Sequence, residues 1–170
     1  MAIYARVMTQ EEKNLLLKDI CARLPYGVIV KFEVDTSYDT AFESVYQTSY
    51  FDGELLSLNV GTEEVELSII SNDRNTIDYI DELLIAQPVT FTECIPYLFP
   101  LSSMTEGKKK EYYNLCIEEE REEMEFGEWI TRVYYHNTTE AIDWLNKNHF
   151  DYRGLIKKGL AIDCTNLDIY

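Results

Sequence analysis

The segment from His149 to Arg153 holds the densest mixture of potentially reactive side chains in the chain. His149 and Asp151 are residue types that can form an acid–base pair, and Tyr152 and Arg153 could orient an anionic substrate. Residues 147–158 carry four basic side chains against one acidic side chain, so the segment is a basic patch. The same residues also suit a structural role, in which Asp151 caps a helix, Phe150 and Tyr152 lie in the core, and Arg153 pairs with a surface carboxylate. A small enzyme or ligand-binding domain therefore stands as the alternative hypothesis.

Other patterns that would indicate catalysis or metal binding are incomplete. The two histidines, His136 and His149, lie outside any HExxH motif, and no GxSxG or GxGxxG motif is present. Gly107 and Lys108 do not belong to a phosphate-binding loop, because Lys109 stands where that motif requires Ser or Thr. The sequence therefore predicts no cofactor and no catalytic motif.

A run of glutamates over residues 118–128 offers clustered carboxylates, the ligands that hard cations prefer. Adjacent glutamates on a helix point in different directions, however, and the run lacks the alternating ligands of a calcium loop. We interpret it as the solvated face of a helix and predict no metal site.

The charge of the protein is strongly acidic and unevenly distributed. The 170 residues include 15 Lys and Arg against 31 Asp and Glu, a net charge of −16. Residues 33–82 hold 13 acidic side chains and a single basic one, Arg74. Because nucleic-acid binding proteins concentrate positive charge against phosphates, we expect no direct binding of DNA or RNA. A basic protein is the expected partner.

Tyrosines accompany the acidic residues of this middle region. Tyrosine is favoured at recognition surfaces, because it offers a large contact area with little rotamer entropy, but it is also a good strand residue. We select as candidate interaction residues two tyrosines and four carboxylates, namely Tyr46, Tyr50, Asp52, Glu54, Glu64 and Glu66.

The first half of the chain predicts one helix followed by antiparallel strands. Thr9 and Glu12 form a capping-box pattern, and an apolar stripe that includes Cys21 follows, which indicates a helix over residues 10–24. Residues 28–34 predict a strand, and residues 35–40 a polar loop. Asp52-Gly53 predicts a two-residue hairpin between strands 44–51 and 54–60, and a turn at 62–64 leads to a strand over 65–70.

The second half predicts mainly helices. The pattern favours helices over residues 76–85, 106–125 and 152–158, and another that begins at Thr138 or Thr139. Two prolines make residues 95–104 a buried extended connector, and residues 129–135 form a candidate strand. The expected fold is α+β, a small antiparallel β-meander packed with about four helices, in a single domain over residues 1–170.

The sequence predicts a cytoplasmic location for the protein. No apolar run approaches the roughly 18 residues that a membrane helix needs, and no secretory signal pattern is present. The four cysteines are widely separated, which suits reduced and mostly buried thiols: Cys21, Cys94, Cys116 and Cys164. We therefore expect no contact with a membrane.

Three separated stretches carry a resemblance. They are residues 15–27 (LLLKDICARLPYG), residues 96–105 (PYLFPLSSMT), and residues 148–156 (NHFDYRGLI) running on to 159–163 (GLAID). Together they resemble a widespread set of short uncharacterised proteins from gut anaerobic bacteria and their mobile elements. The resemblance implies a host-cell cytoplasm and a phage or mobile-element setting, and it implies no activity.

The function hypothesis follows from the charge distribution and the lack of a catalytic motif. We expect a non-enzymatic interaction protein whose acidic, tyrosine-bearing strands meet a basic partner. One form of this hypothesis is mimicry of a nucleic-acid backbone that inhibits or regulates a host protein. The sequence leaves the oligomeric state open.

Overall fold

A five-stranded sheet organises the computed structural model, which describes residues 8–39, 44–45, 47–71, 73–116 and 139–170. The strand order is β5–β4–β1–β6–β7, and every neighbouring pair is antiparallel except β6–β7. The strands are β1 (Ile29–Asp35), β4 (Thr48–Leu58), β5 (Val65–Ile69), β6 (Ile95–Leu98) and β7 (Ile162–Asp163). The first three form a meander, so the predicted α+β class is confirmed.

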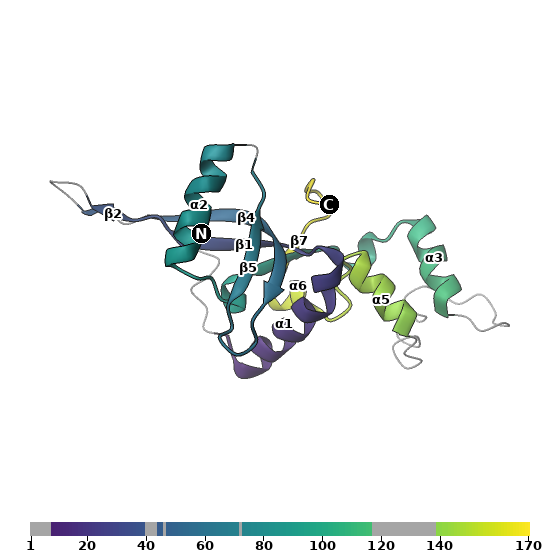
Figure 1. Ribbon diagram of the computed structural model, residues 1–170. Coiled ribbons are helices and arrows are strands. Elements are labelled where there is room, and N and C mark those ends of the chain that lie inside the picture. The colour runs from purple at the N-terminus through teal and green to yellow at the C-terminus, as the bar shows by residue number, and fades with distance from the viewer. Residues whose placement is uncertain (1–7, 40–43, 46, 72, 117–138) are drawn as a thin grey trace.

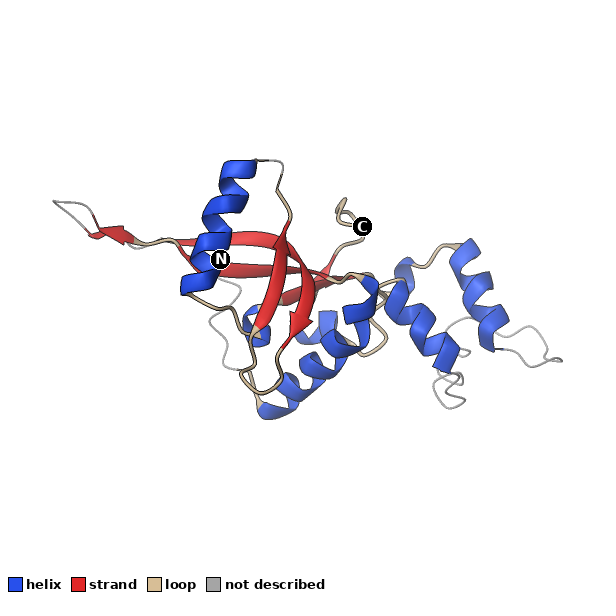
Figure 2. Ribbon diagram, viewed as in Figure 1, coloured by secondary structure: helices blue, strands red, loops and turns tan. Residues whose placement is uncertain are grey.

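Helices flank the sheet, and a short ribbon extends from it. The helices are α1 (Gln10–Arg23), α2 (Arg74–Ala86), α3 (Glu106–Cys116), α5 (Thr139–Lys147) and α6 (Leu155–Lys158). The ribbon consists of β2 (Tyr38–Asp39) and β3 (Ser44–Val45). It projects beyond one end of the sheet, whereas α3 and α5 lie beyond the opposite end (Figure 1). Figure 2 separates helices from strands in the same view.

The predicted first helix is confirmed at both ends. The Glu12 N–H donates to Thr9 Oγ1 at 3.2 Å, and the Thr9 N–H donates to Glu12 Oε2 at 2.9 Å, which completes the capping box. After α1, residues Leu24–Tyr26 form a 3₁₀ turn, and Gly27 has a φ of 69°, a left-handed conformation that suits glycine.

The buried face of α1 differs from the predicted stripe. Leu16 and Ile20 are fully buried, but Cys21 is exposed. The remaining buried positions of α1 are charged: Asp19 and Arg23 are both 0% exposed. The predicted stripe thus shares Leu16 and Ile20 with the buried face of the helix, and two charged residues complete that face.

The main core lies against one face of the sheet. Residues at alternate positions of β1, Val30, Phe32 and Val34, point into a cluster with Leu16 and Ile20 of α1 and Ile80 of α2. Because strand side chains alternate between faces, the intervening residues of β1 point to the opposite face. Leu16 and Ile20 of α1 and Ile80 of α2 belong to the same cluster as these strand residues, so both helices pack against the core side of the sheet.

The predicted hairpin at Asp52-Gly53 is wrong, because β4 runs without interruption from Thr48 to Leu58. Gly53 is a buried mid-strand residue that pairs with Val30 on one side and Ile69 on the other. A Cβ at this position would lie 3.2 Å from Phe32 Cε1 and 3.2 Å from the Ser68 carbonyl oxygen. The glycine therefore permits a close approach inside the sheet and makes no turn.

The chain reverses at two other places. Between β4 and β5, the chain turns at residues 60–62, two residues before the predicted turn at 62–64, and the Asn59 side chain accepts hydrogen bonds from the N–H groups of Gly61 and Thr62. Between β1 and β4, the predicted polar loop is partly wrong, because Tyr38 and Asp39 pair with β3 to form the ribbon.

The predicted connector over residues 95–104 is buried and extended at its start. All four residues of β6 are buried, and the strand pairs with both β1 and β7. The strand β7 was not predicted. The candidate strand 129–135 and the second half of the predicted helix 106–125 lie outside the described residues.

A second apolar cluster joins α3 and α5. It contains the buried residues Met104, Tyr112, Ala141, Leu145 and Phe150. The Trp144 ring stacks on Phe150, with centroids 5.8 Å apart and an interplanar angle of 11°. Phe99, which follows β6, packs against the same cluster and connects it to the sheet.

Replacing Gly53 tests its role inside the sheet. Gly53→Ala places a methyl group against Phe32 and the Ser68 carbonyl, so it should lower the free energy of unfolding by about 1–3 kcal/mol. Chemical denaturation measures this change. The control is Gly107→Ala in α3, where the nearest atom to an added Cβ is Thr105 Oγ1 at 3.9 Å and no loss is expected. Equal stability of the two variants would contradict the close-approach interpretation.

Candidate functional site

The segment around residues 149–153 lies where the sheet meets the second apolar cluster. The Phe99 N–H donates to the His149 carbonyl at 2.9 Å, and the Asp151 N–H donates to the Phe99 carbonyl at 2.8 Å. These two bonds form a parallel bridge between residues 99 and 150 that continues the line of β6. Backbone hydrogen bonds alone therefore fix this segment against the end of β6.

Asp19 joins this segment to α1 through two guanidinium groups. Its carboxylate accepts hydrogen bonds from Arg23 Nε at 2.7 Å and Nη2 at 3.1 Å, and from Arg153 Nη1 at 2.7 Å. The side chains of Asp19 and Arg23 are 0% exposed, and that of Arg153 is 11% exposed. Buried charges of this kind are tolerated only when they are paired and hydrogen-bonded.

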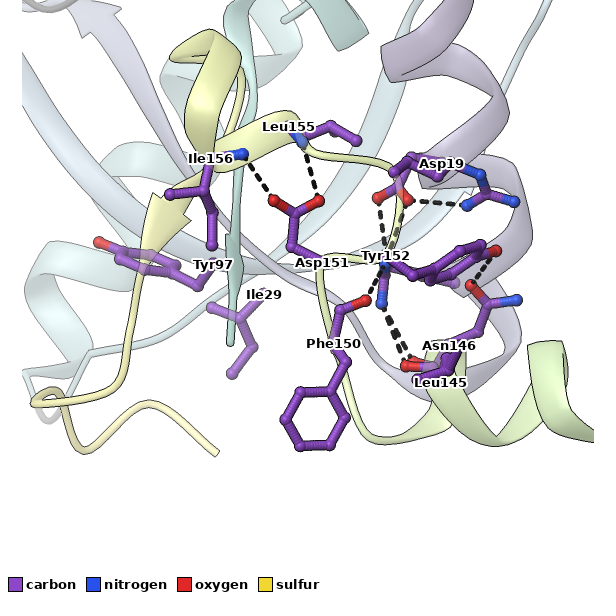
Figure 3. Close-up of polar contacts among 12 residues, drawn as sticks. Asp19, Ile29, Tyr97, Leu145, Asn146, Phe150, Asp151, Tyr152, Leu155 and Ile156 are labelled. Carbon is purple, nitrogen blue, oxygen red and sulfur yellow. Dashed lines mark hydrogen bonds and ion pairs between the residues drawn. The ribbon is translucent and has the colours of Figure 1, made fainter. Parts of the chain in front are cut away.

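Arg23 uses its remaining donors on backbone carbonyls of the same segment. It donates to Phe150 O at 2.8 Å, and at 3.4 and 3.5 Å to Leu145 O and Asn146 O. The Leu145 and Asn146 carbonyls also accept the N–H groups of Phe150 at 3.0 Å and His149 at 3.1 Å, so the guanidinium adds to backbone bonds that already close the end of α5. Figure 3 shows these contacts converging between Asp19 and Phe150.

The other polar side chains of the segment also make intramolecular contacts. The two carboxylate oxygens of Asp151 accept the N–H groups of Leu155 at 2.8 Å and Ile156 at 2.9 Å, which caps α6 (Figure 3). The Tyr152 hydroxyl donates to Asn146 Oδ1 at 3.0 Å, and the Arg153 guanidinium lies 4.5 Å from the centroid of the Tyr152 ring. These contacts favour the structural interpretation of the segment over a catalytic one.

His149 is buried in an unusual environment. Its φ of 55° is left-handed, its ring stacks on Tyr170 with centroids 3.9 Å apart, and its Nδ1 atom is buried without a hydrogen-bond partner. Burial lowers the pKa of His149 to about 4, the positive charges of Arg23 and Lys108 add to the shift, and Asp19 opposes it. The imidazole is therefore neutral at pH 7, and among the described residues no hydrogen bond joins it to Asp151.

Tyr170, which was not predicted as a site residue, connects this segment to the sheet. Its hydroxyl donates to the Tyr97 carbonyl at 2.9 Å and accepts the Ile29 N–H at 3.2 Å, so it bridges β6 and β1. The residue as a whole is 45% exposed, but its hydroxyl end is enclosed, and this burial raises the pKa of the phenol. No local pattern in the last ten residues indicates such a contact.

The candidate interaction residues gather on the face of the sheet opposite the main core. Tyr50, Asp52 and Glu54 occupy alternate positions of β4, directly across from Glu33, Lys31 and Ile29 of β1. On β5, Glu66 pairs with Ser57, whereas the neighbouring Val65 and Leu67 enter the core. Glu64 precedes β5 on the same side by alternation, and Tyr46 lies outside the described residues. We call this surface the open face.

Two further acidic residues belong to the open face and were not selected from the sequence. Glu33 and Asp35 alternate with the core residues of β1, a pattern that could have indicated them. Partial burial and the neighbouring Glu33 carboxylate raise the pKa of Tyr50, so this half-exposed tyrosine stays protonated at neutral pH. Hydrogen bonds from Ser37 lower the pKa of Asp35, so its carboxylate stays ionised.

The carboxylates of the open face have few positive neighbours. Asp52 accepts a hydrogen bond from the Tyr97 hydroxyl at 2.7 Å, and Glu66 accepts one from Ser57 Oγ at 2.9 Å. Both donors are neutral, so these contacts leave the negative charge uncompensated. On the described strands of this face, Lys31 is the basic residue in register with the acidic ones.

A cleft of about 410 Å³ opens where the ribbon leaves the sheet. Three carboxylate residues line it, Glu33, Asp35 and Glu93, together with amide, hydroxyl and apolar side chains. Among the described residues, no group of three or more His, Cys, Asp or Glu side chains is placed to hold a metal ion. The three carboxylates give the cleft an acidic lining.

Comparison of the chain with protein-family models, with curated proteins and with solved structures finds no match. Across the described part of the chain, no helix has the length and apolar character needed to cross a membrane.

Removing the buried carboxylate should be costly. Asp19→Asn leaves Arg23 buried without its anion, so the free energy of unfolding should fall by about 3–5 kcal/mol. Urea denaturation of this variant and of Glu11→Gln, the same acid-to-amide change at an exposed position of α1, gives the comparison. A loss below 1 kcal/mol in Asp19→Asn would show that the buried pair contributes little to stability.

The buried histidine predicts a pH dependence of stability. Between pH 6.5 and about 4 the unfolded chain binds a proton at His149 that the folded chain does not, so the free energy of unfolding falls as the pH is lowered. This contribution should reach about 3 kcal/mol near pH 4.

Thermal unfolding from pH 7 to pH 4 should show this fall relative to His149→Asn, which removes the titrating ring and tolerates a left-handed φ. The variant is the control, because both proteins share the titration of their carboxylates. Parallel pH profiles for the two proteins would contradict the assignment.

Proposed function

We propose that this protein is a non-enzymatic interaction module that binds a basic partner protein through the open face of its sheet. The observation that carries the proposal is the register of β1 and β4, which aligns Glu33, Tyr50, Asp52 and Glu54 on the face opposite the core. An acidic surface of this kind attracts a basic partner over long range and accelerates its association.

The composition of the open face supports binding of a protein. Tyr50 is 44% exposed and stands among carboxylates, where it offers contact area at a low entropic cost. The charge of −16 on the whole chain disfavours nucleic acid and anionic lipid as direct partners. The contacts of Asp151, Tyr152 and Arg153 within the fold also weigh against the enzyme alternative.

The resemblance to uncharacterised proteins of gut anaerobes and their mobile elements provides a setting for this activity. In that setting, an acidic module could occupy the nucleic-acid groove of a host nuclease or regulator, with carboxylates in place of phosphates. Such an inhibitor acts in the cytoplasm and needs no cofactor. Its binding weakens as salt rises, because the interaction depends on exposed charges.

A charge reversal tests whether the open face binds the partner. The tagged protein captures binding proteins from a lysate of a gut anaerobe at about 50 mM and about 300 mM salt, and mass spectrometry identifies them. Wild type should capture a stoichiometric basic protein at low salt and lose it at high salt. The double variant Glu54→Lys/Glu66→Lys should lose it at both.

The matched control is Asp78→Lys/Asp81→Lys, which makes the same change in net charge at exposed positions of α2. This control should retain capture at low salt, with only a small loss from the altered net charge. Equal loss in both variants, or no basic protein captured by wild type, would overturn the proposal.

A further inference from the structure

Strand β1 is paired along only part of one edge. On one side, β4 pairs with every residue from Ile29 to Asp35. On the other side, β6 pairs with Val30 and Lys31 only. Among the described residues, β1 therefore has an unpaired edge from residue 32 to residue 35.

The register identifies the backbone groups that lie on this edge. The Thr36 N–H donates to Gln47 O at 2.8 Å, and the Leu55 N–H donates to Val28 O at 2.9 Å. Since antiparallel hydrogen bonding alternates along a strand, even-numbered residues of β1 bond to β4 and odd-numbered residues face the other way. Glu33 and Asp35 thus direct their N–H and C=O groups to the unpaired edge.

The cleft of about 410 Å³ lies along this unpaired edge. Its lining consists of residues 33–35 of β1, of Ser37, Gln47 and Thr48 near the start of the ribbon, and of residues 87–89 together with Glu93. Glu93 is held in place because its carboxylate accepts the N–H and hydroxyl of Thr90 at 2.7 and 2.8 Å. The site thus combines strand N–H and C=O groups that face away from β4, two buried valines (Val34 and Val89), the exposed Pro88, and three carboxylates.

Charge selects the occupant of this edge. A second copy of the chain that paired β1 with β1 would place Glu33 and Asp35 opposite like charges, which is unfavourable. Basic side chains opposite Glu33 and Asp35 would form favourable cross-strand pairs instead. Residues between them would point to the other face of the sheet, beside Val34 and Val89.

We propose that β1 and the adjoining cleft bind an extended segment of a partner protein as an added strand, with Lys or Arg at every second position and apolar residues between. This inference rests on the proposed function and specifies how the basic partner is recognised. The open edge of four residues spans about 13 Å, enough for a segment of four or five residues. Backbone bonds give affinity, and the alternating side chains give specificity.

Two peptides of equal composition separate strand addition from simple charge attraction. The first is a fluorescein-labelled Val-Lys-Val-Lys-Val-Lys with blocked ends, and the second is Lys-Lys-Lys-Val-Val-Val prepared in the same way. In fluorescence anisotropy titrations at low salt, the alternating peptide should bind at least tenfold more tightly. Equal affinity for both peptides would overturn strand addition.

A backbone variant tests the edge itself. Glu33→Pro removes an N–H that faces the cleft and leaves the β1–β4 bonds unchanged, so it should weaken the alternating peptide at least tenfold. The control Glu33→Ala loses the same carboxylate but keeps the N–H, and it should weaken binding only two- to threefold. Equal effects of the two variants would overturn the proposal.

Amide hydrogen exchange gives a readout that needs no variant. In the free protein the amides of residues 33 and 35 should exchange rapidly, and saturating alternating peptide should slow them at least tenfold. Unchanged exchange at both amides would overturn strand addition, as would a dimer in sedimentation analysis that Glu33→Pro abolishes.

The outcomes for the edge and for the open face are distinguishable. If the alternating peptide fails while Glu54→Lys/Glu66→Lys still abolishes capture of a basic protein, the edge proposal alone is overturned. If wild type captures no basic protein from the lysate, the proposed function is overturned whatever the peptides do.

Discussion

The buried carboxylate of Asp19 is the contact on which the rest of the arrangement depends. It holds two guanidinium groups, one from its own helix and one from Arg153, 134 residues further along the chain. Burying an unpaired charge is strongly unfavourable, so the contacts among Asp19, Arg23 and Arg153 must all form for α1 to pack in the core. The remaining donors of Arg23 then fix the end of α5 through the carbonyls of Leu145 and Phe150. The N-terminal helix and the C-terminal third of the protein therefore acquire their relative position from one polar cluster.

This cluster also takes two of the fifteen basic residues, Arg23 and Arg153, into the interior of the protein. The basic patch over residues 147–158 directs Arg153 inward to Asp19, and Lys108 lies 5.2 Å from the Phe150 ring centroid in the second apolar cluster. Positive charge that could have balanced the sheet is thereby used at the junction of sheet and helices. The open face keeps its carboxylates with Lys31 as the basic residue in register. Uneven charge along the sequence thus becomes uneven charge across the molecule.

The sequence predicts features that depend on neighbours in the chain and misses those that depend on distant residues. The capping box of Thr9 and the end of α6 at Gly159, with a φ of 71°, follow from local rules. Gly53 was misjudged because its role depends on Phe32 and Ser68, which the local Asp-Gly pattern does not contain. Asp19 and Arg23 have the spacing of a surface ion pair, and their burial depends on distant partners: Arg153 for Asp19, and backbone carbonyls of residues 145–150 for Arg23. Alternation along β1 could have placed Glu33 and Asp35 on the acidic side of the sheet, although neither was selected, and the partial pairing of the β1 edge depends on where β6 approaches.

The unpaired edge of β1 has a local cause in the chain that leads into β6. Phe91 is 2% exposed and anchors the 3₁₀ turn Phe91–Glu93 in the main core, so the chain reaches β1 only at Ile95, opposite Lys31. A strand that continued backwards from Ile95 would have paired with Glu33, but the turn places Glu93 across the cleft instead. Unpaired strand edges invite association with other strands, and flanking charges restrict which strands can join. Three carboxylates line the cleft beside this edge, and like charges directly opposite one another disfavour pairing of the edge with a second copy of the same acidic chain. The core packing of Phe91 thus accounts both for the unpaired edge of β1 and for the position of Glu93 across the cleft from it.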